Sequence, residues 1–295
     1  MNYITDPLTF TFFLEALAAS AIVGLVCAVV GSFMVLRGLA FMGDALSHSA
    51  FPGVVVAYMI QAPFYIGASI AAVGTALAIG WVTRQGKIRS DTAIGVLFAA
   101  MFALGIFLFS LIPNYVGDLF GFLFGNVLGI GLSDLISLAI LGALVIGTVA
   151  LLWKELLFAT FDPLGAAASG LPVGRLDYLL LALIALTIVI SLQSVGIILV
   201  VAMLVTPAAT AQLLSKSFGR LVVIAGTVGV ICPVIGLYFS FWLNSASGAT
   251  VVLVESTVFV VVLLGTTVLS RHPTESSSEA GISDAAAGSA AAQAD

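Results

Sequence analysis

The sequence predicts an all-α polytopic membrane protein, and three observations carry that prediction. The 295-residue chain is 61% hydrophobic and only 8% charged, whereas about 25% of the residues are charged in a typical soluble domain. Its mean hydropathy is +1.25. The apolar residues gather in runs of about 20, the length that a helix needs to cross the hydrocarbon core. A soluble protein with a large core, the alternative, has no need of runs this long.

Nine apolar runs predict the membrane spans. They cover residues 12–36, 39–60, 64–83, 92–111, 133–153, 177–195, 197–215, 221–243 and 250–270. The sixth and seventh runs almost touch, so they form either a tight hairpin or a broken pair of half-helices. The short, glycine-rich segment 117–131 is typical of an interfacial or re-entrant piece on the outer side. We therefore expect eight to nine transmembrane helices.

The basic residues predict the orientation of these spans. If all nine runs cross, one side of the membrane receives every lysine and arginine of the chain: Arg37, Arg84, Lys87, Arg89, Lys154, Arg175, Lys216, Arg220 and Arg271. By the positive-inside rule that side is the cytoplasm, which places the N-terminus outside and the C-terminus inside. Since no basic residue precedes Arg37, the start lacks the charged region of a cleaved signal peptide, and the first run is expected to be a retained span.

The longest predicted cytoplasmic connection is the segment 154–176. Within it we expect a short alanine-rich helix that Asp162 caps and that a glycine ends just before Pro172. The connection is either a simple tether or a docking helix for a cytoplasmic partner. It belongs to one transmembrane domain, residues 1–271. The Ser/Ala/Gly-rich acidic tail, residues 272–295, is predicted to be disordered and cytoplasmic.

Several classes of function have no support in the composition. The two cysteines, Cys27 and Cys232, lie in apolar runs and are too few for a thiolate metal cluster or a disulfide framework. The net charge of −5 comes partly from the tail, and nothing favours nucleic-acid binding. Residues 80–88 superficially resemble a phosphate loop, but their spacing is wrong and no Ser or Thr follows Lys87. We therefore expect the chain not to hydrolyse ATP itself.

The candidate functional residues are Asp44 and His48, inside the second run. Four residues is about one helical turn, so both side chains project from one helix face. Ionisable groups at membrane depth normally face a bundle interior or a water-filled path. Their oxygen and nitrogen atoms suit a divalent metal ion such as Mn²⁺ or Zn²⁺. The alternative is a satisfied core pair, although small residues and Pro52 nearby favour a helix that lines a path.

One Asp and one His are too few for a metal site, because Zn²⁺ and Mn²⁺ take four or more ligands. A two-fold homodimer would bring two such pairs together at its axis. Two other acids, Glu15 and Glu255, fall near the outer ends of their spans, where we expect their carboxylates to reach the headgroup region.

The stretch FMVLRGLAFMGDALSHSAFPG (residues 33–53) strongly resembles the signature of the membrane permease subunits of manganese/zinc ABC importers. Further blocks follow in the family's order: DTAIG (91–95), LFGNVL (123–128), KELL (154–157), FD (161–162), ASGLP (168–172) and LVTPAATA (204–211). The resemblance covers nearly all of residues 12–270. It implies an ABC importer permease fold like that of the type II (vitamin B12-type) importers, in the plasma membrane of a bacterium.

The resemblance also implies partners and residue roles. Two permeases would pair with two cytoplasmic ATP-binding subunits and receive metal from an extracytoplasmic binding protein. Asp44 and His48 would be the translocation-site ligands. The helix that couples to the ATPase would lie in residues 160–172, and its candidate residues are Asp162, Pro163, Gly165, Ala167, Ser169 and Gly170. Glu255 and the acidic tail fall outside the resemblance.

We therefore expect a non-enzymatic membrane subunit of an ATP-driven importer of Mn²⁺ or Zn²⁺, with no permanently bound cofactor. Three alternatives remain open. A permease for a metal chelate predicts a wide apolar cavity and no dependence on His48. A secondary metal carrier predicts uptake driven by a proton gradient, against which the shortage of buried acids argues. In a non-transporting scaffold, Asp44 and His48 would be dispensable.

Overall fold

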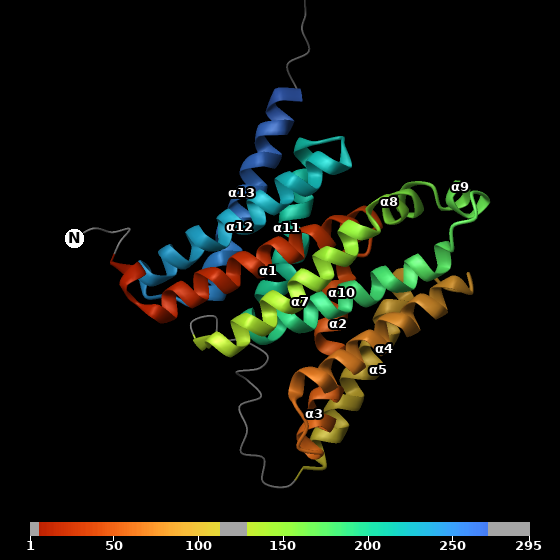
Figure 1. The fold of residues 1–295 in the computed structure, drawn as a ribbon, viewed down its shortest axis with the longest axis horizontal. Coiled ribbons are helices and arrows are strands. Elements are labelled where there is room, and N and C mark those ends of the chain that lie inside the picture. Colours follow the sequence, from red (N-terminus) through yellow and green to blue (C-terminus); the bar gives the residue numbers. More distant parts are fainter. Residues whose placement is uncertain (1–5, 113–128, 271–295) are drawn as a thin grey trace, which may run out of the picture.

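The computed structural model describes residues 6–112 and 129–270, and all regular structure in that part is helical (Figure 1). After the turn η1 (Pro7–Thr9), the helices are α1 (Thr11–Leu36), α2 (Ala40–Ser49), α3 (Phe51–Met59), α4 (Phe64–Arg84), α5 (Ser90–Ser110), α7 (Leu132–Leu151), α8 (Trp153–Phe161), α9 (Pro163–Ala168), α10 (Val173–Val195), α11 (Ile197–Leu214), α12 (Phe218–Leu243) and α13 (Ser247–Ser270). Eight of these described helices are long and apolar enough to cross a membrane. The expected tail and most of the expected outer segment 117–131 lie outside the described residues.

The second predicted span is two short helices rather than one. α2 ends at Ser49 and α3 begins at Phe51, with Ala50 between them. The cause is Pro52, which has no N–H to donate and whose ring would clash with the carbonyl of His48 in a continuous helix. The prediction of eight to nine spans is thus met by eight long helices and one broken pair.

The sixth and seventh runs are two full-length helices joined by a single residue. Gly196 separates α10 from α11 with φ +82°, a backbone conformation that side chains other than glycine rarely adopt. The tight turn was therefore the correct alternative, and the pair of half-helices was wrong.

Glycines let the helices approach closely at two junctions. A Cβ on Gly24 of α1 would overlap the backbone carbonyl of Gly229 in α12. The same holds for Gly53 of α3 against Gly67 of α4. In a bilayer, close packing of this kind replaces the hydrophobic drive that soluble helices have. Figure 1 shows α3, α4 and α5 on one flank of the bundle and α11, α12 and α13 on the other, with α1, α7 and α10 between them.

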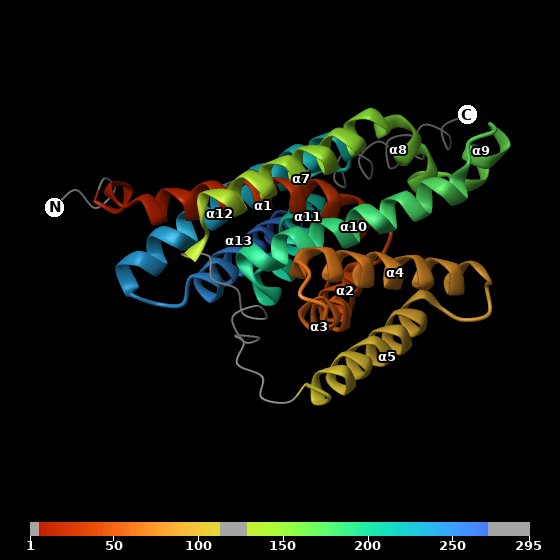
Figure 2. The same ribbon diagram turned by 60° about the horizontal axis from the view of Figure 1, so that its bottom comes forward.

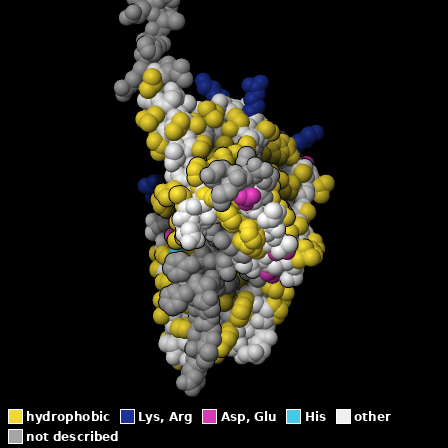
Figure 3. All heavy atoms as spheres, turned by 90° about the vertical axis from the view of Figure 1, so that its left-hand side faces the viewer, with side chains coloured by type: hydrophobic (Ala, Val, Ile, Leu, Met, Phe, Trp, Pro, Cys, Tyr) yellow, Lys and Arg dark blue, Asp and Glu magenta, His cyan; other side chains and the backbone are white. Residues whose placement is uncertain are grey.

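Contacts between side chains sort the helix ends into two groups. Arg37 at the end of α1 bonds to Asp177 at the start of α10, whereas Phe13 near the start of α1 packs on Phe241 at the end of α12. Figure 2 shows α8, α9 and the α4–α5 connection at one end and the start of α1 at the other. Seen from the left of Figure 1, hydrophobic side chains spread over much of the described surface (Figure 3), as expected for a bundle embedded in lipid.

Candidate functional site

Asp44 and His48 lie together on the exposed face of α2. The side chain of Asp44 is 55% exposed and that of His48 is 28% exposed. Phe41, one turn earlier on the same face, is 75% exposed. The remainder of α2 packs inward, with these residues buried: Met42, Gly43, Ala45, Leu46, Ser47 and Ser49. The pair therefore lies at the surface of this single chain and is not a satisfied pair inside its core.

The distance within the pair fits two ligands of one ion. His48 Nε2 and Asp44 Oδ1 are 3.6 Å apart, beyond the 2.7–3.2 Å of an ordinary hydrogen bond. Two ligand atoms that each lie about 2.1 Å from an ion in tetrahedral geometry are separated by about 3.4 Å. The two atoms are therefore spaced as two ligands of a shared cation would be.

Two aromatic side chains of α5 hold the imidazole of His48. The ring centres of Phe98 and Phe102 lie 5.5 and 5.3 Å from that of His48, and the Phe102 ring meets it edge-on. Contacts of this kind restrict the ring's orientation and contribute about 0.5–1.5 kcal/mol each. These two phenylalanines, which we call the aromatic wall of His48, were not predicted from the sequence. The available signal was the pair of phenylalanines four residues apart on one span.

One chain supplies an incomplete set of ligands. Among the described residues, no group of three or more His, Cys, Asp and Glu side chains could hold a metal ion. A transition-metal site needs four or more donors, so the Asp44–His48 pair could supply at most half of one.

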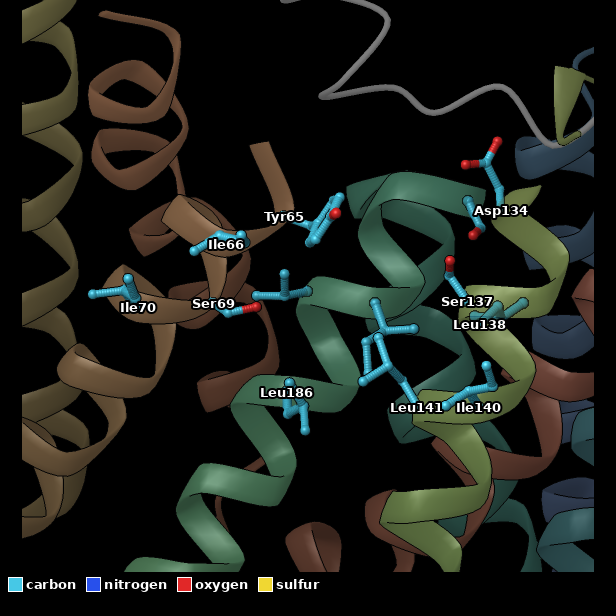
Figure 4. A pocket seen from close by; sticks show the side chains of 13 residues that line it. Tyr65, Ile66, Ser69, Ile70, Asp134, Ser137, Leu138, Ile140, Leu141 and Leu186 are labelled. Carbon is cyan, nitrogen blue, oxygen red and sulfur yellow. The ribbon is translucent and has the colours of Figure 1, made fainter. Parts of the chain in front are cut away.

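An apolar cavity of about 470 Å³ lies elsewhere, between α4, α7 and α10 (Figure 4). Its polar groups include Tyr65, Asp134 and Ser137, which Figure 4 shows at one end of the cavity. Asp134 is the one carboxylate on its lining, and α2 and α5 contribute nothing to it. The cavity therefore lacks the donors of a metal site and is separate from the Asp44–His48 face.

The short helix predicted in the 154–176 connection is confirmed as α9. The Asp162 side chain accepts a hydrogen bond of 2.8 Å from Gly165 N, and the Ser169 hydroxyl donates one of 2.9 Å to Gly165 O. Gly170 then ends the helix with φ +85°. Leu164, at the tip, is 83% exposed and Ala167 is exposed as well. The caps make this a defined helix with an uncovered apolar tip; its role in coupling stays a prediction.

Glu255 does not reach the headgroup region, so that expectation was wrong. Its side chain is fully buried, and neither carboxylate oxygen has a hydrogen-bond partner among the described residues. The reason is packing, because α13 lies against α11 and α12 and turns this position inward. Glu15 of α1, for which the same was expected, is partly buried.

Residues 9–266 match the ABC 3 transport family along almost the whole described chain. The chain belongs to the ABC 3 transport family. It is therefore a multi-pass membrane subunit of a bacterial ABC transporter, a transport protein and not an enzyme. In such importers a separate subunit hydrolyses ATP, and a binding protein delivers the substrate.

Curated proteins and solved structures are similar to the chain over most of its length. The chain is 47% identical over 264 residues to the "Manganese transport system membrane protein MntC" of Listeria monocytogenes, covering 90% of this chain and 94% of the relative. It resembles a chain of "PsaBC from Streptococcus pneumoniae in complex with Fab" with a TM-score of 0.78 and 38% identity, covering 88% of this chain and 94% of that one. An inward-facing "putative metal-chelate type ABC transporter" shares the fold at 16% identity, with a TM-score of 0.70 and 90% of each chain covered. The predicted ABC importer permease fold is confirmed.

Proposed function

We propose that this chain imports Mn²⁺ and that Asp44 and His48 are its ligands during translocation. The observation that carries the proposal is the spacing of Asp44 Oδ1 and His48 Nε2, 3.6 Å apart on the exposed face of α2. Carboxylate and imidazole donors suit Mn²⁺ and Zn²⁺ alike. The choice of Mn²⁺ is supported by the relative from Listeria monocytogenes, which is described as a manganese transport protein.

A second copy of the chain completes the ligand set in this proposal. If two α2 faces meet at a two-fold axis, they supply two carboxylates and two imidazoles. A Phe41→Cys variant should then cross-link to its partner through a flexible reagent. Trp81→Cys should not, because Trp81 is also largely exposed, at 61%, but lies on α4. The native cysteines are both buried, so background reaction is low. Equal cross-linking of the two variants would reject the α2 face as the interface.

The transport cycle follows from a site shared between two chains. Metal arrives from an extracytoplasmic binding protein, α9 docks on the ATP-binding subunit, and movement between the two copies opens the site to alternate sides. The N-terminus lies outside and the C-terminus in the cytoplasm. A cysteine at Ser247 should therefore react with an impermeant reagent from outside, whereas a cysteine at Ser217 should be protected. The reverse pattern would overturn the orientation.

Competition between metals tests the proposal. The permease, its ATP-binding subunit and its binding protein are assembled in lipid nanodiscs and supplied with Mn²⁺, Zn²⁺ or Fe²⁺. We expect Mn²⁺ to stimulate ATP hydrolysis at the lowest concentration, and the Asp44→Asn complex to show no stimulation. Stimulation only by a metal chelate would favour the chelate permease. Uptake that follows a proton gradient without the ATPase would favour a secondary carrier, and uptake by neither route would leave a scaffold.

A further inference from the structure

The second turn of α10 is tied to the end of α1 by the guanidinium of Arg37. Arg37 donates from Nη1 to Asp177 Oδ1 at 2.7 Å, and from Nε and Nη2 to Thr160 Oγ1 at 3.1 and 3.0 Å. The Thr160 hydroxyl in turn donates to Leu156 O at 2.7 Å, which fixes it to α8. One guanidinium thus joins α1, α8 and α10, and both charged side chains are partly sheltered, at 16% and 31% exposure.

A second arginine reaches the same turn from α4. The guanidinium of Arg84 lies 5.4 Å from the centre of the Tyr178 ring, the geometry of a cation–π contact. Gly174 makes room for it, because a Cβ at that position would overlap the Arg84 guanidinium. The side chains that receive both arginines are therefore neighbours in sequence, Asp177 and Tyr178.

The two arginines lie shortly before the two helices that form the candidate site, α2 and α5. Arg37 lies three residues before the start of α2, which carries Asp44 and His48. Arg84 ends α4, and a short loop leads from it into α5, whose Phe98 and Phe102 hold the His48 ring. On the other side, α10 follows α9 after only four residues. The turn thus lies between α9, the helix that would meet the ATPase, and the two helices of the candidate site, α2 and α5.

We propose that the second turn of α10 is the joint through which movement of α9 reaches the Asp44–His48 face, with Arg37 and Arg84 as positioning residues. The inference rests on the proposed function. An arginine suits the task because three separate nitrogens of its planar guanidinium can reach Asp177 and Thr160, whereas the three donors of a lysine ammonium all lie on one nitrogen. Movement of this turn shifts the first residues of α2 and α5 together, so Asp44 and His48 keep their position relative to Phe98 and Phe102.

Two matched pairs of variants test the joint. Arg37→Lys keeps the charge but loses the planar guanidinium, and Arg220→Lys is its control, an exposed arginine on α12. Gly174→Ala displaces Arg84 without changing any charge, and Gly219→Ala is its control, because a Cβ there meets nothing within 4 Å. Each is assembled with its ATPase and binding protein in sealed vesicles. The readouts are Mn²⁺ transported per ATP hydrolysed and Mn²⁺ affinity measured without nucleotide.

We expect Arg37→Lys and Gly174→Ala to lower the transport ratio at least about fivefold, the lower bound of typical allosteric coupling. Their Mn²⁺ affinity should stay at the wild-type value, since no ligand is touched, and the two controls should match wild type. A wild-type ratio in both test variants overturns the inference, and so does an equal fall in the controls. If Arg37→Lys fails to assemble, Asp177→Asn, which breaks the same contact from α10, takes its place with the same criteria. Failure of the wild-type complex to transport Mn²⁺ would instead reject the proposed function.

Discussion

Two acids of the predicted membrane spans, Asp44 and Glu255, have opposite surroundings. Asp44 is 55% exposed on α2 beside His48, whereas Glu255 is fully buried on α13 with both oxygens unpartnered. From the sequence, both are single carboxylates in apolar runs. The packing of each helix separates them, because α2 turns its acid away from its own bundle and α13 turns its acid into one.

This difference in exposure bears on which of the two acids could bind a transported cation. A carboxylate at membrane depth is costly wherever it lies. On an outward face it can be compensated by a cation and by a partner chain, and it can release the cation again when that chain moves. In a closed interior, nothing that moves through the protein can reach it. The proposed function therefore gives a transport role to Asp44 and none to Glu255.

The largest effect should come from the ligands. In Asp44→Asn the amide has nearly the same size but no charge to offer a cation, and both copies of a symmetric site carry the change. We expect Mn²⁺ uptake to fall by at least about 100-fold, because losing even an indirect partner of a metal ligand costs roughly 10- to 100-fold. His48→Gln should behave alike. Uptake of radioactive manganese by cells, normalised to the membrane level of each variant, measures both.

The matched control for Asp44→Asn is the same chemical change at the other acid, Glu255→Gln. Thermal unfolding in detergent should be unchanged in Asp44→Asn, because that side chain is 55% exposed. His48→Gln also loses the ring contacts with Phe98 and Phe102, so it should unfold at a slightly lower temperature. Near wild-type uptake by either ligand variant would place the site elsewhere and remove the contrast between α2 and α13.

An intermediate effect on uptake should come from the aromatic wall of His48, Phe98 and Phe102. Phe102→Ala removes an edge-on ring 5.3 Å from the imidazole and frees its orientation. A loss of about 0.5–1.5 kcal/mol is expected for such a contact, or roughly a two- to twelvefold weaker apparent affinity for Mn²⁺. Phe107→Ala, a 60% exposed phenylalanine on the same helix, is the control. Equal effects of the two changes on the manganese dependence of uptake would show that the wall does not act through His48.

The sequence predicted those features that depend on local order. The apolar runs mark the spans, and Asp162 with Gly170 brackets α9. The break in the second run was not predicted, although Pro52 explains it. Asp44 and His48 meet because they are one turn apart. Contacts across the chain left no such mark, so Arg37 gave no hint of its bond to Asp177, 140 residues away. The prediction for Glu255 was wrong for the same reason, because the burial of this side chain depends on which helices cover α13.

The smallest effect should come from Glu255, the other half of the comparison. The side chain makes no hydrogen bond among the described residues, so replacing it by an apolar side chain removes an unsatisfied polar group. Glu255→Gln should leave both uptake and unfolding temperature unchanged. Glu255→Met, unbranched and apolar, removes a burial cost of about 1–3 kcal/mol, and each kcal/mol raises the unfolding temperature by roughly 2–4 °C in a chain of this size. Both variants are measured by uptake and by thermal unfolding in detergent. If uptake is lost while the fold persists, Glu255 takes part in transport, and burial in a single chain is no guide to the function of an intramembrane acid.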